Sequence, residues 1–356
     1  MREDKFRIES HKLIYHVGRV HDWLKGENIY PLYIEIAPFS GCNHRCIFCA
    51  LDYLKYKPEL LGTDCLKRFI AGVARKGVKS IHYAGEGEPL LHKDITDIVA
   101  FTKKAGVDAA ITTNGVLLDK KKSGKLLSSL SWLRVSLNAG TQENYAVIHN
   151  TKKEDFGIVI NNLKQAVKIR NKNKYGCTIG VQFLLIPQNY KEAIPLARML
   201  QDTGVDYLAI KPYSWHPLSI NRIGRNFKYA GQFYLDKELE AYVKDNFQIV
   251  FRRHAMEKLG QSRPYKHCLG LPFWAYIAAS GDVYPCSRFL GDKNFIFGNI
   301  CHDTFKDIWE GKRRKRIMDL LYNKWDINKC REACRLDEIN RYLWELKNPA
   351  GHVNFI

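Results

Sequence analysis

The sequence predicts an α/β fold built on parallel strands. Short runs rich in β-branched and aromatic residues alternate with longer amphipathic segments, as strands alternate with helices. The runs predicted as strands cover residues 32–39, 80–85, 108–115, 132–140, 178–186 and 206–213. The segments predicted as helices cover 64–77, 94–106, 155–172 and 190–204, and several of them end in glycine. Such alternation needs right-handed crossovers, which give either an open doubly wound sheet or a barrel.

Polar and glycine-rich segments follow the predicted strands. In chain order they are a cysteine-rich loop at 41–53, Gly-Glu-Gly-Glu-Pro at 85–89, Thr-Thr-Asn-Gly at 112–115, Ser-Leu-Asn-Ala-Gly at 136–140 and Lys-Pro-Tyr-Ser-Trp-His-Pro at 211–217. The carboxyl ends of parallel strands form the working face in both sheet and barrel architectures. We therefore expect these segments to meet at one rim.

The pattern changes after about residue 250. A hairpin that turns at Ser280-Gly281-Asp282 is followed by basic helical segments. We expect an N-terminal helical extension at 1–30, a main domain at 31–254 and a smaller lobe at 255–356. Five of the ten cysteines lie in that lobe.

Composition limits the classes of function. The chain has no apolar segment long enough for a signal peptide or a membrane span, which predicts a cytoplasmic protein that does not bind membranes. Thiols stay reduced in that compartment, so clustered cysteines favour metal or catalytic chemistry. The net charge of +19 favours an anionic partner. The basic runs at 120–125 and 312–316 have no interleaved aromatic residues and are interpreted as solvated surface, so nucleic acid is not the expected partner.

The cysteine-rich loop contains Cys42, Cys46 and Cys49. A tetrahedral zinc ion would need a fourth ligand, and His44, which lies between two of the cysteines, is poorly placed to provide it. Three thiolates on one loop instead match a 4Fe-4S cluster in which one iron is open.

These cysteines, with Phe48 before the last one, resemble the signature of the radical S-adenosylmethionine (SAM) superfamily. Residues 85–89 resemble the glycine-glycine-glutamate-proline motif of that family, with Glu86 in place of the first glycine. The resemblance implies a partial (β/α)6 TIM-like barrel, a SAM-binding [4Fe-4S] cluster, and a 5'-deoxyadenosyl radical that abstracts hydrogen from the substrate.

The resemblance also implies which residues approach SAM. Gly87 and Glu88 would receive its amino group, and Ser136 and Asn138 would approach its carboxylate or ribose. Further rim candidates are Asn114 and Lys211, the latter for SAM or for an anionic group of the substrate. For Asn114, Ser136 and Asn138 the alternative is an ordinary turn or capping role, and Lys211 could instead reach solvent.

The C-terminal lobe resembles SPASM and twitch subdomains. Twelve residues separate Cys268 from Gly281 and four separate Gly281 from Cys286, as in that family pattern. Cys330 and Cys334 follow with a C-x-x-x-C spacing in place of the usual C-x-x-C. The resemblance implies one auxiliary [4Fe-4S] cluster held by these four cysteines. The remaining cysteines, Cys65, Cys177 and Cys301, are expected to be buried free thiols, and Cys301 is also a candidate hydrogen donor.

The first functional hypothesis is a radical SAM oxidoreductase. It would dehydrogenate a small carbohydrate-like or nucleotide-linked substrate, with the auxiliary cluster as electron acceptor and a flavodoxin or ferredoxin as electron donor. The alternative is a peptide or protein maturase, or an epimerase with Cys301 as donor. The 41 residues before Cys42 are expected to be too few for a peptide-recognition domain. A zinc-bearing nucleic-acid-binding protein is a remote alternative, in which residues 85–89 would resemble the family motif by coincidence.

Overall fold

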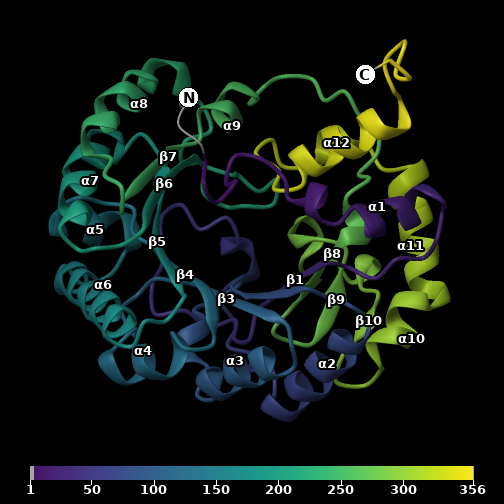
Figure 1. Cartoon of the computed structure of the whole chain (residues 1–356), viewed down its shortest axis with the longest axis horizontal. Helices are drawn as coiled ribbons and strands as arrows, with labels where there is room; N and C mark the ends of the chain where they lie inside the picture. Colours follow the sequence, from purple (N-terminus) through teal and green to yellow (C-terminus); the bar gives the residue numbers. More distant parts are fainter. Residues whose placement is uncertain (1–3, 356) are drawn as a thin grey trace.

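The computed structural model describes residues 4–355. The six predicted strands are confirmed and pair in parallel in chain order. They are β1 (Tyr33–Ile36), β2 (Ser80–Tyr83), β3 (Asp108–Thr113), β4 (Leu130–Ser136), β5 (Thr178–Leu185) and β6 (Tyr207–Pro212). The sheet curls into an incomplete barrel whose outer side is covered by helices (Figure 1).

The helices cover the predicted segments and several that the sequence pattern did not indicate. In chain order they are α1 (Val17–Leu24), α2 (Thr63–Arg75), α3 (Ile95–Lys104), α4 (Lys120–Leu126), α5 (Gln142–His149), α6 (Glu154–Lys172), α7 (Ala193–Gln201), α8 (Tyr234–Leu239), α9 (Arg253–Glu257), α10 (Phe305–Glu310), α11 (Lys312–Asn323) and α12 (Asp337–Lys347). No helix among residues 4–355 is long and apolar enough to span a bilayer.

The C-terminal lobe continues the barrel sheet. The predicted hairpin is present as β8 (Trp274–Ile277) and β9 (Asp282–Tyr284), and Gly281 in its turn has φ +87°. Strand β8 pairs in parallel with β1, β9 pairs with β10 (Gly298–Asn299), and β7 (Gln248–Phe251) extends the other edge beyond β6. The boundary near residue 255 therefore falls within one ten-stranded sheet.

Alternation along the strands separates an apolar layer from a polar lumen. On β5, Ile179, Val181 and Phe183 are fully buried in the main hydrophobic core. On the opposite face of the sheet, β1 and β2 place Glu35 beside His82, which are neighbours in register. The barrel lumen is therefore lined by groups that can interact with a polar ligand.

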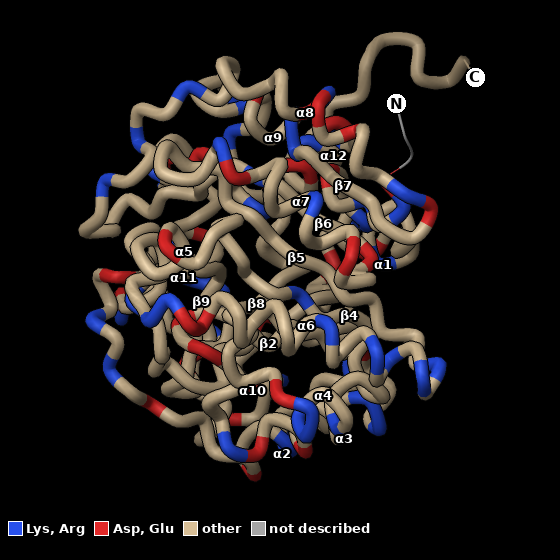
Figure 2. Tube along the Cα trace, turned by 90° about the vertical axis from the view of Figure 1, so that its left-hand side faces the viewer, with Lys and Arg blue, Asp and Glu red and all other residues tan. Residues whose placement is uncertain are grey.

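Basic residues are scattered over many helices and loops (Figure 2). Most of the run at 120–125 is exposed on α4, as predicted. The interpretation of 312–316 as wholly solvated was wrong at Arg314, whose exposed fraction is 5%. Its guanidinium lies 3.8 Å from the centroid of the Trp309 ring and donates a hydrogen bond to the Trp309 carbonyl at 2.9 Å. This arginine is thus part of the packing of α10 against α11.

Candidate metal centres and their surroundings

The three cysteines of the loop after β1 lie close enough to influence one another. Burial raises the pKa of Cys42 to about 11, and the pKa of Cys46 is raised well above its ordinary value, first by burial and then by the other two thiols. Burial also raises the pKa of Cys49. Such crowded thiols lose their protons readily only when a cation stabilises the thiolates together. An all-thiolate set of this kind fits the iron of an iron–sulfur cluster.

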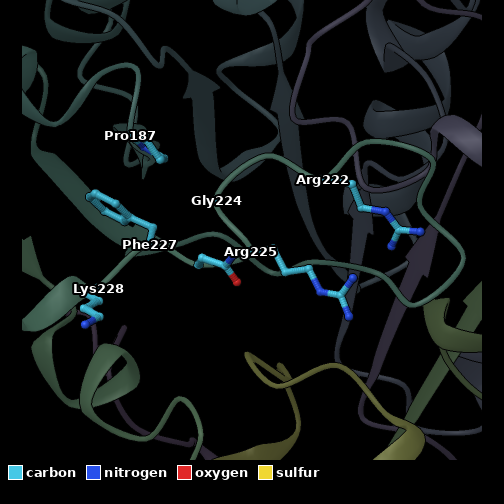
Figure 3. Close-up of a pocket in the computed structure, with 7 residues that line it drawn as sticks. Pro187, Arg222, Gly224, Arg225, Phe227 and Lys228 are labelled. Carbon is cyan, nitrogen blue, oxygen red and sulfur yellow. The ribbon is translucent and has the colours of Figure 1, made fainter.

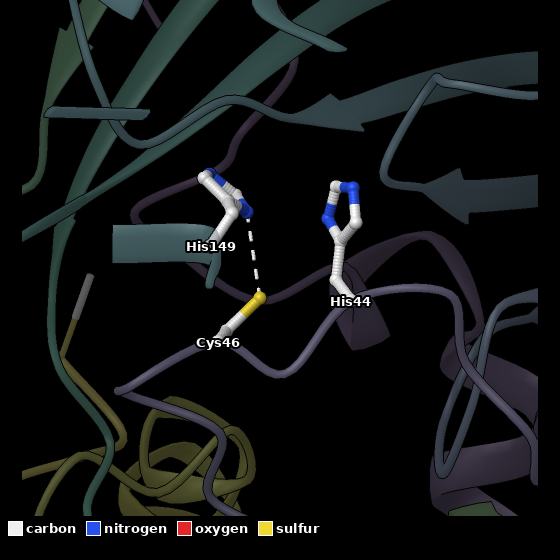
Figure 4. Close-up of side chains that lie close together, drawn as sticks. All are labelled: His44, Cys46 and His149. Atoms are coloured by element: carbon white, nitrogen blue, oxygen red, sulfur yellow. Dashed lines mark hydrogen bonds between the residues drawn. The ribbon is translucent and has the colours of Figure 1, made fainter. Parts of the chain in front are cut away.

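Two side chains of this loop, His44 and Cys46, lie close to His149 of α5 (Figure 4). The candidate ligand atoms of His44, Cys46 and His149 lie within 4.8 Å of one another. Nδ1 of His149 is 3.4 Å from Sγ of Cys46, and Nε2 of His44 is 3.5 Å from a carboxylate oxygen of Asp155. No signal in the sequence indicated His149, because it ends α5 outside every recognised motif.

The segment at 85–89 packs directly on the cysteine-rich loop. The backbone N–H of Glu88 donates to the Gly41 carbonyl at 2.9 Å. A Cβ on Gly87 would lie 2.3 Å from that same carbonyl oxygen, so only glycine fits there without a shift of backbone. The two segments therefore form one unit at the carboxyl rim.

The carboxylate of Glu88 joins the end of β2 to the end of β3. It is buried and accepts hydrogen bonds from the Leu90 N–H (2.9 Å), the Thr113 hydroxyl (2.6 Å) and the Asn114 N–H (2.7 Å). A direct contact between Glu88 and the amino group of SAM stays a prediction. In the structure, Glu88 holds the ends of β2 and β3 together. The backbone carbonyls of the same turn remain as candidate acceptors for the amino group of SAM.

The other predicted rim residues fall into two groups. Phe48 is buried against His149, and the Asn114 side chain donates to that of Asn43 at 2.7 Å, which places both in the wall around the cysteine-rich loop. Ser136 ends β4 and is half-buried. Asn138 has no exposed surface, and its side chain accepts from the Leu184 N–H at 2.7 Å. Asn138 therefore has a structural role at the rim, and its contact with SAM stays a prediction.

The four predicted auxiliary ligands converge in the C-terminal lobe. Burial raises the pKa of Cys268 and of Cys334, and that of Cys286 to about 12, and thiols of the same set add to each shift. Cys330 accepts from the indole N–H of Trp325 at 3.4 Å. Despite the unusual C-x-x-x-C spacing, Cys334 thus lies near enough to influence the other thiols, and its role as a fourth ligand stays a prediction.

The prediction that Cys301 is a free thiol and a hydrogen donor was wrong for this structure. Cys301 forms a disulfide with Cys65 of α2, so neither residue is the expected free thiol. A disulfide sulfur has no hydrogen to donate. Cys177 is free and buried, as predicted.

The barrel lumen carries an excess of cationic side chains. Arg335 forms an ion pair with Glu35, and its side chain is 51% exposed although it contacts residues of the barrel interior. Lys211 is the last residue but one of β6, and it has no ion-pair or hydrogen-bond partner among the described residues. Burial lowers the pKa of Lys211 well below its ordinary value, and Arg134 lowers it further. An anionic ligand in the lumen would relieve this repulsion.

A surface pocket lies beside the loop that follows β6 (Figure 3). Its volume is about 540 Å³. Figure 3 shows Arg222 and Arg225 on neighbouring parts of the loop, with Phe227 and Lys228 at its other end. Both arginines also lie over the ring of Trp215, at 5.5 and 5.0 Å from its centroid.

Both cysteine sets lie in regions that match known protein families. Residues 36–200 match the radical SAM superfamily, and residues 268–335 match the SPASM iron-sulfur cluster-binding domain. The chain contains a radical SAM domain followed by a SPASM iron-sulfur cluster-binding domain. Its two domains imply a SAM-binding [4Fe-4S] cluster, SAM itself and an auxiliary iron–sulfur cluster.

Curated relatives that are similar along most of this chain have names that describe different activities. A tungsten-containing aldehyde ferredoxin oxidoreductase cofactor-modifying protein of Pyrococcus furiosus is 25% identical over 85% of the chain and 88% of that protein. An AdoMet-dependent heme synthase of Methanosarcina barkeri is 27% identical, covering 83% and 87%. The antilisterial bacteriocin subtilosin biosynthesis protein AlbA of Bacillus subtilis is 26% identical, covering 91% and 72%.

Solved structures share the radical SAM and SPASM fold. Streptococcus suis SuiB bound to S-adenosylmethionine aligns with a TM-score of 0.66 at 18% identity, covering 86% of this chain and 72% of that one. Native anSMEcpe with bound AdoMet aligns with a TM-score of 0.57 at 18% identity, covering 89% of this chain and 95% of that one. The fold prediction is therefore confirmed.

Proposed function

We propose that this radical SAM protein is a maturase, which abstracts hydrogen from a residue of a peptide or protein substrate. Similarity to the subtilosin biosynthesis protein along nearly the whole chain supports this alternative. Dehydrogenation of a small carbohydrate-like or nucleotide-linked molecule gains no comparable support. The epimerase variant is weakened because its hydrogen donor, Cys301, is held in a disulfide.

The observation that carries the proposal is the loop after β6, which presents a surface suited to a polypeptide. Leu218 and Ile220 are exposed, and Arg222 and Arg225 follow them in the sequence. Exposed apolar side chains beside arginines suit a chain that offers apolar and acidic side chains in turn. This loop begins where β6 ends, so a bound peptide would pass close to Lys211 at the lumen.

The lumen supports a carboxylate-bearing substrate. Of its cationic groups, Arg335 is paired with Glu35, whereas Lys211 is unpaired among the described residues. In addition, the Nε and one Nη atom of Arg331 are buried without a hydrogen-bond partner among the described residues. Arg331 directly follows the predicted ligand Cys330 in the sequence. Its charge also lowers the pKa of Cys49, so it lies near both cysteine sets. We infer that a carboxylate of the substrate is held in this region.

The cofactors supply the radical, and the protein provides position and protection. When bound, the SAM cluster and SAM supply a 5'-deoxyadenosyl radical. The buried unit of the cysteine-rich loop and residues 85–89 would orient SAM at the rim. Lys211 and Arg331 would hold the substrate so that one of its C–H bonds faces that radical.

A deuterium-transfer assay tests the proposal even while the substrate is unidentified. Perdeuterated extract of cells that contain the protein is divided into a polypeptide fraction and a small-molecule fraction. Each fraction is incubated anaerobically with enzyme, SAM and reductant, and 5'-deoxyadenosine is analysed by mass spectrometry. Deuterium from the polypeptide fraction supports a maturase. Deuterium from the small-molecule fraction alone would replace the proposal with the oxidoreductase hypothesis.

A further inference from the structure

The hydrogen-bond partners of His149 fix which of its ring nitrogens carries the proton. Nε2 faces the backbone N–H of Asn138 at 3.2 Å, and a backbone N–H can only donate. Nε2 is therefore the acceptor, because a protonated Nε2 would place two N–H groups face to face. The proton of the neutral ring then lies on Nδ1. Nδ1 is the atom 3.4 Å from Sγ of Cys46, so the ring donates an N–H···S hydrogen bond.

The surroundings of His149 hold the ring in this orientation. The ring has an exposed fraction of 1% and stacks on Tyr145, with 4.2 Å between centroids and 27° between planes. Phe48 and His44 meet it edge-on, at 5.6 and 5.4 Å between centroids. Rotation of the imidazole would break the bond from Asn138 and disturb three packed rings. The donor is thus preorganised toward Cys46 from outside the cysteine-rich loop.

A hydrogen bond to a cluster thiolate changes the reduction potential of the cluster. Reduction adds negative charge to the iron and its sulfur ligands, so the N–H dipole stabilises the reduced state more than the oxidised state. We propose that His149 is a positioning residue that donates to the Cys46 thiolate and raises the reduction potential of the SAM cluster. This role eases the electron transfer that precedes SAM cleavage, and it does not depend on the class of substrate.

Redox titration of the two-cluster protein, followed by electron paramagnetic resonance, tests the proposal. His149→Phe keeps a ring of similar shape but has no N–H. We expect the one-electron reduction equilibrium of the SAM cluster to become about tenfold less favourable, which is a shift of about 59 mV to more negative potential. The auxiliary cluster in the same sample should not shift. Tyr145→Phe, which alters the same group of rings without changing a donor to Cys46, is the matched control.

Two results of the titration would contradict the proposal. The first is an unchanged potential of an intact SAM cluster in His149→Phe. The second is an equal shift in Tyr145→Phe or in both clusters, which would indicate a general packing effect.

A measurement on the unaltered protein decides the matter if His149→Phe does not assemble its cluster. Protein labelled with ¹⁵N in the histidine rings is reduced, and weak ¹⁵N couplings to the SAM cluster are recorded by electron spin echo methods. We expect one weak coupling, of the size produced through an N–H···S bond. Absence of any ring coupling overturns the proposal, and so does a coupling large enough for direct bonding of the ring nitrogen to iron.

Discussion

At the scale of single residues, Glu86 marks the point where the chain departs from the family motif. One of its carboxylate oxygens is buried without a hydrogen-bond partner among the described residues. Burial raises its pKa to about 7, and the neighbouring Glu59 adds to the shift. A carboxyl group in such a site is more stable when protonated. Glu86 therefore makes the folded state sensitive to pH near neutrality.

The sign of this sensitivity follows from proton uptake on folding. The ordinary pKa is 4.5 and the folded value is about 7, so the folded chain binds the extra proton between these pH values. The contribution of Glu86 to stability should therefore fall as pH rises from 4.5 to 7 and then level off. Glu86→Gln should remove this dependence and raise the free energy of unfolding at pH 8 by about 1–3 kcal/mol. Anaerobic urea denaturation at pH 5 and pH 8 measures it.

Glu143→Gln is the control for that experiment, because Glu143 is exposed on α5. Its effect should be small and similar at both pH values. If Glu86→Gln gave the same small effect as the control at pH 8, the carboxyl group would be charged and satisfied in the folded protein.

A site formed by residues at a fixed spacing in the sequence could be predicted. A site formed by side chains that only the fold brings together could not. Thiolate chemistry restricts what Cys42, Cys46 and Cys49 can hold, so their pattern alone indicated a cluster. His149 acquires its role only because α5 returns to the loop after β1. Arg314 was misjudged for a related reason. Its charge predicted a side chain exposed to solvent, and only tertiary packing places Trp309 beside it.

At the scale of elements, we expect assembly of the SAM cluster to depend on the contact between residues 85–89 and the cysteine-rich loop. Gly87→Ala would place a methyl group 2.3 Å from the Gly41 carbonyl oxygen and 2.5 Å from that of Phe39. Because these neighbours are backbone atoms, the two segments must separate. We expect the variant to lose the SAM cluster and to keep the auxiliary one, so that iron content falls by about half on the two-cluster assignment.

Iron analysis and assay of 5'-deoxyadenosine measure the effect of Gly87→Ala. Gly72→Ala on α2 is the matched control, because no atom lies within 4 Å of its added Cβ. Full iron content in Gly87→Ala would show that the backbone contact is not needed to hold the cluster.

The elements themselves were predictable to different degrees. The strands β1 to β6 follow from runs of β-branched residues bounded by turn signals, which are local properties. The sequence also indicated the hairpin of β8 and β9. It did not indicate that β8 would lie beside β1, since parallel pairing of segments about 240 residues apart has no local signal. Strand β7 was not predicted either, although β1 and β2 have the same length of four residues.

At the scale of the whole molecule, a shared sheet and a disulfide are among the connections that hold the C-terminal lobe against the barrel. The sheet is shared through β1 and β8, and the disulfide joins Cys65 to Cys301, which lie 236 residues apart. The expectation of a reducing compartment argued against any disulfide. The spacing of these two cysteines carries no signal either, because only the folded chain brings α2 to the segment after β10.

Cys301→Ala tests whether this disulfide joins the two parts. A cross-link that closes so long a loop restricts the unfolded chain, so its loss should lower the free energy of unfolding by about 2–4 kcal/mol under oxidising conditions. With a thiol reductant present, the variant and the unaltered protein should differ by less than about 1 kcal/mol. Cys177→Ala removes a buried free thiol, so its cost should be the same with and without reductant. Formation of 5'-deoxyadenosine and product should continue in reduced Cys301→Ala. A loss of product stereochemistry there would restore the hydrogen-donor hypothesis and limit the disulfide to oxidised protein.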